Sequence, residues 1–220
     1  MRPFVVFLLM WTAAGIEAAP VKEAPPLRSI LFPIPGKPAG KNAGSSPETV
    51  PENALFLMGK GKAEADLLAS FLLNENENAD REFTEALAVY YIAEAKTEGI
   101  NHDIAFVQMC LETGFLRFGG LVVPEMNNFC GLGAIGPGEE GLWFPSVELG
   151  VRAHIQHLQA YASEDPLRGE LVDPRYRFVR RGSAPLVQGL AGTWAADTLY
   201  AEKIELIFER LEQFRDTASK

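Results

Sequence analysis

The chain has 220 residues, a net charge of −9 at neutral pH and two cysteines. An acidic chain without a basic stripe is a poor nucleic-acid binder, so we expect no nucleic-acid partner. Two cysteines are too few for a disulfide framework, and neither has the CxxC neighbour that is typical of a structural metal site. The spacing of Cys110 and Cys130 leaves open whether they pair with each other.

The N-terminus has the layout of a secretory signal peptide. Arg2 precedes an apolar run over residues 4–10, and small residues follow just before residue 20. The apolar run is shorter than the roughly 20 residues that a membrane span needs. We therefore expect residues 1–19 to be removed on export, and the mature chain not to insert stably in a membrane. An uncleaved anchor is the alternative, because residues 16–20 form an imperfect cleavage site.

The rest of the chain divides into a tether and one domain. Residues 20–53 are rich in Pro, Gly, Lys and Ser and show almost no apolar periodicity, which predicts a disordered tether. Residues 54–220 suffice for a single hydrophobic core, so we expect one monomeric domain. Export would place it in the periplasm or cell envelope, or outside the cell.

Helical periodicity dominates the first half of this domain. Apolar residues at a 3.6-residue period predict helices over residues 62–73, 81–96 and 102–113. Gly99 and Gly114 stand where a left-handed residue commonly ends a helix. The helices over residues 81–96 and 102–113 are therefore expected to have sharply defined C-terminal ends.

The second half begins with loops. Residues 115–145 are rich in Gly and Pro but carry aromatic side chains, which predicts a binding cleft and a short hairpin. A helix over residues 146–161 follows, with a serine as its N-cap. Two last helices are expected over residues 184–190 and 197–214, the latter burying Leu199. The predicted fold is mainly helical, with at most a small β-hairpin.

Glu112 is the candidate for acid chemistry. Cleavage of a glycosidic bond needs a carboxylic acid that stays protonated near neutral pH. In the last turn of its helix, Glu112 meets the negative end of the helix dipole, and Phe115 and Phe118 would desolvate it. Both effects raise the pKa of a carboxyl group. From position alone, an ordinary exposed glutamate at a helix end is the alternative.

Several blocks of sequence, in a fixed order, resemble the glucosaminidase domain of glycoside hydrolase family 73 across about residues 104–211. They comprise residues 111–114, 118–120, 124–133, 150–162, 172–176, 181–185 and 192–195. The resemblance implies a lysozyme-like, mainly helical fold with a long cleft. It also implies that the substrate is peptidoglycan, the polymer of N-acetylglucosamine and N-acetylmuramic acid.

The resemblance implies roles for particular residues as well. Glu112 stands where the family keeps its Glu before a small residue and Gly, so it would be the general acid. Asn127, Asn128 and Phe129 would line the cleft, a loop whose amides suit N-acetyl and hydroxyl groups. Cys130 departs from the family pattern here, because it intervenes before the glycine that follows.

Three more substrate-binding candidates come from the downstream blocks. Tyr176 belongs to the segment that resembles the family's aromatic block. Trp194 and Tyr200 belong to the block expected at the start of the last helix. All three are candidate substrate-binding residues.

The partner of the general acid has several candidates. Glu125 is our choice of second catalytic carboxylate, because it lies within a matching block. Glu139, Glu140 and Asp173 are the other loop carboxylates. The acetamido group of the substrate could act instead, which is a recognised exception to the scheme with two carboxylates.

The sequence thus predicts an exported endo-β-N-acetylglucosaminidase that hydrolyses the β-1,4 bond following N-acetylglucosamine, without metal or cofactor. A lytic transglycosylase of the same fold and a non-catalytic glycan-binding scaffold are the alternatives. His154 and His157 have a helical spacing that could ligate a metal. No third ligand is evident, so we expect them to have packing roles.

Overall fold

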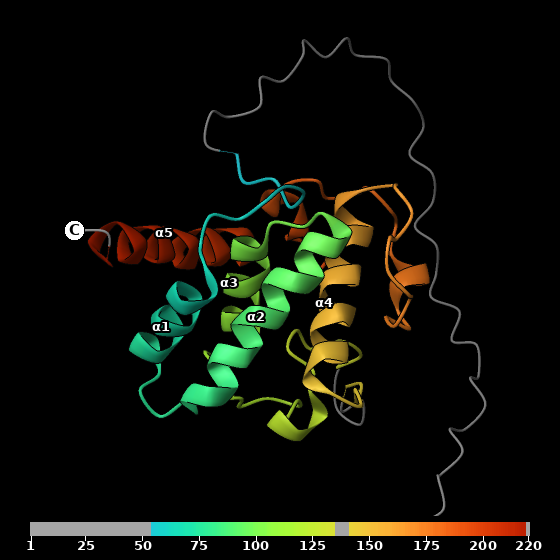
Figure 1. Cartoon of the computed structure of the whole chain (residues 1–220). Coiled ribbons are helices and arrows are strands. Elements are labelled where there is room, and N and C mark those ends of the chain that lie inside the picture. The colour runs from blue at the N-terminus through green and yellow to red at the C-terminus, as the bar shows by residue number, and fades with distance from the viewer. Residues whose placement is uncertain (1–53, 135–140, 219–220) are drawn as a thin grey trace, which may run out of the picture. The chain divides into compact units, whose positions relative to one another are not determined.

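The computed structural model describes residues 54–134 and 141–218, and this part of the chain is mainly helical (Figure 1). The α-helices are α1 (Ala65–Glu75), α2 (Arg81–Glu98), α3 (His102–Thr113), α4 (Val147–Ala162) and α5 (Tyr200–Ala218). Three 3-10 helices are η1 (Pro124–Met126), η2 (Tyr176–Phe178) and η3 (Val187–Leu190). The predicted fold class is confirmed, while the predicted signal peptide and tether lie outside the described residues.

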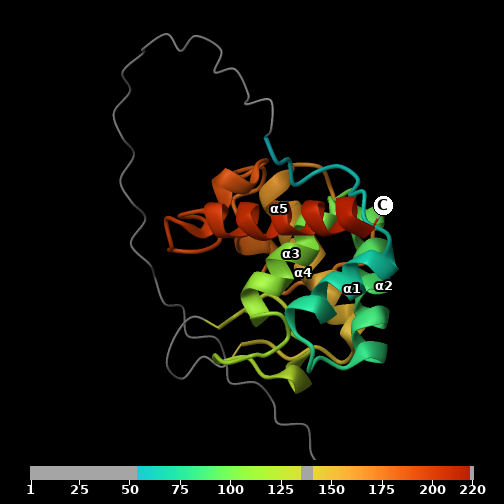
Figure 2. The ribbon, with the colours of Figure 1, turned by 90° about the vertical axis from the view of Figure 1, so that its left-hand side faces the viewer.

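Helix α3 is the centre of the fold. All its residues from His102 to Cys110 are buried, and it contacts each of the other four α-helices. Helices α2 and α4 pack side by side in Figure 1, and α5 lies across α3 in Figure 2. Since every face of α3 is covered, its polar residues must find partners inside the protein. Its C-terminal end carries Glu112.

The helix ends at Gly99, Gly114 and Ser146 agree with their predictions, and each of them depends on local contacts. Gly99 and Gly114 are the C-caps of α2 and α3, with φ values of 78° and 58°. Ser146 caps α4 by accepting a hydrogen bond from the Leu149 amide at 3.3 Å. These ends were predictable because each depends on residues within one turn of the helix.

Helix α1 begins three residues later than predicted, and a distant residue explains the shift. The carboxylate of Asp103 accepts hydrogen bonds from the backbone amides of Lys62 at 2.7 Å and Ala63 at 3.1 Å. These amides are therefore bound by α3 and do not begin a helix. The approach is so close that a Cβ at Gly61 would lie 2.6 Å from Asp103 Oδ1, so glycine is required there.

The predicted helix over residues 184–190 is wrong in its first half. The amide of Leu57 donates to the Pro185 carbonyl at 3.0 Å, and the amide of Val187 donates to the Leu55 carbonyl at 3.0 Å. This pairing holds residues 185 and 186 extended, so only η3 is helical. The backbone partner lies about 130 residues earlier in the chain, which local periodicity does not reveal.

The last helix also differs from its prediction. It begins at Tyr200 because Asp197 forms the turn before it, where its carboxylate accepts a hydrogen bond from the Leu199 amide at 2.9 Å. Leu199 was expected in the core, but it lies in this turn and is 51% exposed. Ile204, Ile207 and Leu211, which were also expected in the core, are buried on the inner side of α5.

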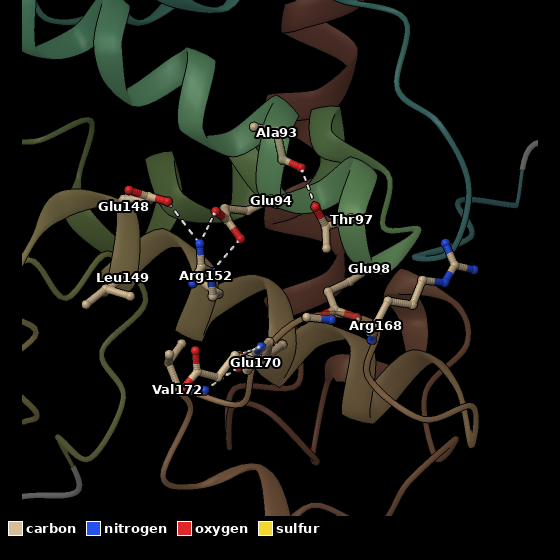
Figure 3. A network of polar contacts seen from close by, with 12 residues as sticks. Ala93, Glu94, Thr97, Glu98, Glu148, Leu149, Arg152, Arg168, Glu170 and Val172 are labelled. Carbon is tan, nitrogen blue, oxygen red and sulfur yellow. Dashed lines mark hydrogen bonds and ion pairs between the residues drawn. The ribbon is translucent and has the colours of Figure 1, made fainter.

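A charged clamp joins α2 to α4 and to the loop that follows α4 (Figure 3). Arg152 donates two hydrogen bonds to Glu94, at 2.9 and 3.0 Å, and one to Glu148 at 2.9 Å. Glu98 accepts hydrogen bonds from the backbone amides of Arg168 at 2.8 Å and of residue 169 at 3.1 Å. A two-point contact between arginine and carboxylate fixes orientation as well as distance. The pair of Arg152 and Glu94 therefore orients α4, whose other side carries two histidines toward the candidate site, while Glu98 holds only the loop that follows α4.

Candidate active site

A pocket of about 370 Å³ opens at the C-terminal end of α3. It is lined by the segment that was expected to form a cleft, by the turn before α5 and by the end of α3. Among its described lining residues, Glu112 is the one that carries a carboxyl group. These residues are Glu112, Thr113, Phe118, Gly119, Gly120, Leu121, Val122, Asn128, Cys130, Gly131, Ala134, Trp194, Ala195 and Tyr200. The volume is within the range of small-ligand sites.

The backbone reverses sharply just after Glu112. Gly114, Phe115 and Leu116 have φ values of 58°, 56° and 61°, which is a left-handed turn. Such a conformation costs about 1–2 kcal/mol for each non-glycine residue. Hydrogen bonds offset this cost, since the Leu116 amide donates to Thr113 Oγ1 at 2.9 Å and Asn76 donates to the Phe115 carbonyl at 2.7 Å. The reversal leaves the Glu112 carboxyl group at the wall of the pocket.

The carboxyl group of Glu112 has an asymmetric environment. Oε1 accepts hydrogen bonds from Trp194 Nε1 at 3.0 Å and from the Tyr200 hydroxyl. Oε2 points toward Gly131, where an added Cβ would lie 3.9 Å away. Because Oε1 already accepts two bonds, the proton of the neutral acid belongs on Oε2. The oxygen that carries the proton is thus the one without these two donors.

Burial and hydrogen bonding act on Glu112 in opposite directions. The residue is reachable by solvent, but protein atoms surround its carboxyl group, and this desolvation raises its pKa. The hydrogen bonds from Tyr200 and Trp194 lower the pKa, and the effect of desolvation is larger. Glu112 therefore keeps its proton to a higher pH than an ordinary glutamate, which suits a proton donor.

Tyr200 is held in place from the inside of the protein. It is 5% exposed, and its hydroxyl oxygen accepts a hydrogen bond from Gln108 Nε2 at 2.8 Å. Burial raises the pKa of Tyr200 well above its ordinary value, and the nearby Glu112 raises it further. Tyr200 therefore stays protonated and can serve as a donor to Glu112 at any pH at which the protein would work.

Trp194 is fixed by a cluster of rings. Its ring centroid lies 5.1 Å from that of His157 and 5.7 Å from those of His154 and Tyr161. His157 Nδ1 in turn lies 2.7 Å from Asp173 Oδ2, and Asp173 is 1% exposed. Asp173 thus supports a ring that contacts Trp194, and it does not line the pocket beside Glu112.

The predicted cleft loop has a more structural arrangement than expected. Asn128 lines the pocket, but it is 1% exposed and its amide donates to the carbonyls of Leu132 and Leu142 at 2.8 and 3.1 Å. Asn127 donates to the Phe144 carbonyl at 3.0 Å. Phe129 is fully buried in the main core. The structure therefore does not bring the Phe129 ring to the pocket, and the two asparagines shape the loop.

Other predicted residues lie away from the pocket lining. Glu125 is exposed on η1, and Tyr176 donates to Gln159 Oε1 at 3.0 Å from η2. Neither lines the pocket that contains Glu112. Glu139 and Glu140 lie outside the described residues, as does the turn of the predicted hairpin.

Three other features of the described part of the chain concern metal binding, membrane-spanning helices and the cysteines. No group of three or more His, Cys, Asp or Glu residues there could hold a metal ion. No helix there is long and apolar enough to cross a membrane. Cys110 and Cys130 are both buried as free thiols, and burial raises the pKa of each. Both cysteines therefore act as packing residues in this structure.

Two polar residues lie behind the site. Gln108 was not among the predicted site residues, and His154 was expected only to pack. Gln108 binds Tyr200, and His154 Nε2 lies 3.1 Å from Gln108 Oε1. Both residues are fully buried on the inner faces of their helices. Polar residues on a predicted apolar face were the available signal, because a buried polar group needs a partner.

One comparison with known proteins identifies a family. A family model described as Glucosaminidase, mannosyl-glycoprotein endo-beta-N-acetylglucosaminidase, matches residues 88–213. An uncharacterised protein of Borreliella burgdorferi is 41% identical over 161 residues, which are 73% of this chain and 79% of that relative. No solved structure matches. The match to the family model extends from α2 into α5 and includes Glu112, Trp194 and Tyr200.

Proposed function

The chain belongs to the glucosaminidase family, and we propose from this that it hydrolyses the β-1,4 bond following N-acetylglucosamine in peptidoglycan. The observation that carries the proposal is the state of Glu112. Its carboxyl group lies in a pocket, its pKa is raised by desolvation, and two donors bind its Oε1. This combination is what a general acid for glycoside cleavage requires.

In the proposed reaction, Glu112 donates its proton from Oε2 to the glycosidic oxygen as the bond to the anomeric carbon breaks. Negative charge then develops on the carboxylate. Trp194 and Tyr200 already donate to Oε1 and stabilise this charge without rearrangement. Donors that are in place before the reaction are effective because they need no reorganisation in the transition state.

The proposal gives the second role to the acetamido group of the substrate. Each N-acetylglucosamine unit carries this group next to the scissile carbon, where it can stabilise the positive charge. Water then bonds to the anomeric carbon and gives a proton to the Glu112 carboxylate, which restores the acid. Glu125 was our first choice for this role, but it is exposed on η1 and does not line the pocket. Asp173 is buried and engaged with His157. The predicted export signal over residues 1–19 completes the proposal by placing the enzyme in the envelope, with the substrate.

The test is product analysis of digested peptidoglycan. The purified chain is incubated with sacculi, beside Glu112→Gln and the control Glu85→Gln, whose side chain lies on the exposed face of α2. We expect fragments with reducing-end N-acetylglucosamine from the wild type and the control, and none from Glu112→Gln. Products that all end in anhydromuramic acid would identify a lytic transglycosylase and overturn the hydrolase proposal. Binding to sacculi without any cleavage would support the scaffold alternative.

A further inference from the structure

A chain of hydrogen bonds leads from Glu112 into the core of the protein. The Tyr200 hydroxyl contacts Glu112 and lies 2.8 Å from Gln108 Nε2. Gln108 Oε1 lies 3.1 Å from His154 Nε2, and His154 Nδ1 lies 2.8 Å from the Tyr91 hydroxyl. Gln108, His154 and Tyr91 are each fully buried. The chain therefore runs through α5, α3, α4 and α2, out of contact with solvent.

The order of donors and acceptors in this chain follows from chemistry. Gln108 presents its NH₂ group to Tyr200, so its Oε1 faces His154 and can only accept. His154 must then carry its proton on Nε2, which leaves Nδ1 to accept from Tyr91. Burial lowers the pKa of His154 to about 3, so the ring is neutral and one tautomer suffices. Every donor in the chain points toward Glu112.

We propose that Gln108, His154 and Tyr91 are positioning residues that fix the direction of the Tyr200 hydroxyl, so that it always donates to Glu112. This inference rests on the proposed function of Glu112 as the proton donor. A tyrosine hydroxyl has one proton and could point toward either neighbour. Because the NH₂ group of Gln108 occupies the other side, the Tyr200 proton has Glu112 as its acceptor. Aligned donors also polarise one another and strengthen the last bond.

The chain sets the direction of a bond and does not carry protons. A proton shuttle needs groups that gain and lose protons in turn, and the amide of Gln108 does not titrate near neutral pH. The effect on Glu112 is therefore static. A strong donor stabilises its carboxylate and keeps the rise in pKa caused by desolvation within limits. If the donors lost their alignment, the bond from Tyr200 would oppose the effect of desolvation on the Glu112 pKa less strongly.

Few other groups near this chain titrate in the neutral range. Tyr91 from α2, Cys130 from the pocket loop and Tyr200 from α5 interact electrostatically with Glu112, and burial raises the pKa of all three. They stay uncharged while Glu112 titrates. His157 interacts electrostatically with His154, and its Nδ1 lies 2.7 Å from Asp173 Oδ2. A change in the titration of Glu112 can thus be followed separately.

The deciding variant is Gln108→Met, which keeps the volume of the side chain and removes both of its hydrogen bonds. We expect kcat to fall about tenfold with little change in KM, because the aligned donor acts mainly on the charged carboxylate. We also expect the pKa of Glu112, measured by NMR on ¹³C-labelled carboxyl groups, to rise. Tyr91→Phe removes only the first donor of the chain and should shift both quantities in the same direction by less. Glu98→Gln is the control, since it alters a buried side chain with two hydrogen bonds in the clamp of Figure 3.

The ¹⁵N resonances of His154 in the wild type supply a test that needs no variant. A proton on Nε2 that persists between pH 5 and 8 is expected, and a proton on Nδ1 would overturn the proposed direction. A Gln108→Met protein with the kcat and Glu112 titration of the Glu98→Gln control would also overturn it. If the wild type cleaves no glycan, the proposed function fails, but the NMR titration still tests the hydrogen-bond chain.

Discussion

Replacing Tyr200 with phenylalanine removes one hydroxyl group and keeps the ring. In the structure this hydroxyl donates to Glu112 Oε1 and accepts from Gln108. A hydrogen bond to a charged group contributes about 1.5–3 kcal/mol. Solvent reaches Glu112, and Trp194 still donates to the same oxygen, so the lower end applies. Since about 1.4 kcal/mol corresponds to a factor of ten in rate, we expect kcat to fall about tenfold.

The same substitution changes the pH dependence in a defined direction. In the proposed reaction Glu112 donates a proton only while it is protonated, so we expect activity to be lost as the pH rises through its pKa. The bond from Tyr200 lowers this pKa, and its removal therefore raises it. One pKa unit corresponds to about 1.4 kcal/mol, so the falling limb of the kcat profile should move up by about one pH unit. The Tyr200→Phe enzyme is thus slower but stays active to a higher pH.

The assay is release of reducing ends from purified peptidoglycan across pH 4 to 9, with circular dichroism to verify folding. Tyr90→Phe is the matched control, because Tyr90 lies half-buried on α2 and takes no part in the contacts of Glu112. Its profile should match that of the wild type. A falling limb that stays in place or moves to lower pH in Tyr200→Phe would refute the assignment of Tyr200 as a donor to Glu112.

Three further predictions concern other parts of the chain. Glu125→Gln should keep kcat/KM within about twofold of the wild type in the same assay, because surface substitutions away from a site usually have small effects. Arg152→Met leaves the buried Glu94 carboxylate without its two-point partner. Because Arg152 is itself partly exposed, the free energy of unfolding should fall by about 2 kcal/mol, less than for a fully buried pair. In thermal melts this corresponds to a drop of about 4–8 °C. Since Cys110 and Cys130 are free and buried, reductant should leave the melting temperature unchanged.

Each of these predictions has an outcome that contradicts it. A loss of more than a hundredfold in Glu125→Gln would return this residue to the role of second carboxylate. If Arg152→Met melts like the wild type, the clamp between α2 and α4 contributes nothing to stability. The double variant Arg152→Met with Glu94→Leu is the control, because it removes both charges of the pair. A fall in the melting temperature on reduction would reveal a disulfide between Cys110 and Cys130.

The predicted fold succeeded where the signal was local. Gly99, Gly114 and Ser146 mark helix ends because each acts within one turn of its own helix. Prediction failed at residues 184–190 and at Leu199, where the outcome depends on contacts from elsewhere. Pairing with residues 55–57 keeps residues 185 and 186 extended. Apolar periodicity alone does not include such partners, since it describes one segment at a time.

The candidate site divides in the same way. Glu112 was found from the sequence because its position at a helix end and the family blocks both pointed to it. Phe129 was expected to face the sugar, but it is buried in the core. A sequence motif in one loop contains residues that stabilise the loop as well as residues that bind a ligand. The motif itself does not show which residues have which role. The packing of each side chain makes that distinction.

The sequence by itself determined the family and the mainly helical fold, and it predicted an acid at the end of α3. Only the tertiary structure decided what surrounds that acid. Tyr200 lies 88 residues from Glu112 and 92 from Gln108, and His154 lies 46 residues beyond Gln108. The direction of the hydrogen bonds among them depends on four helices packing at once. Helical periodicity shows that such side chains face inward, whereas their partners are set by how the helices meet.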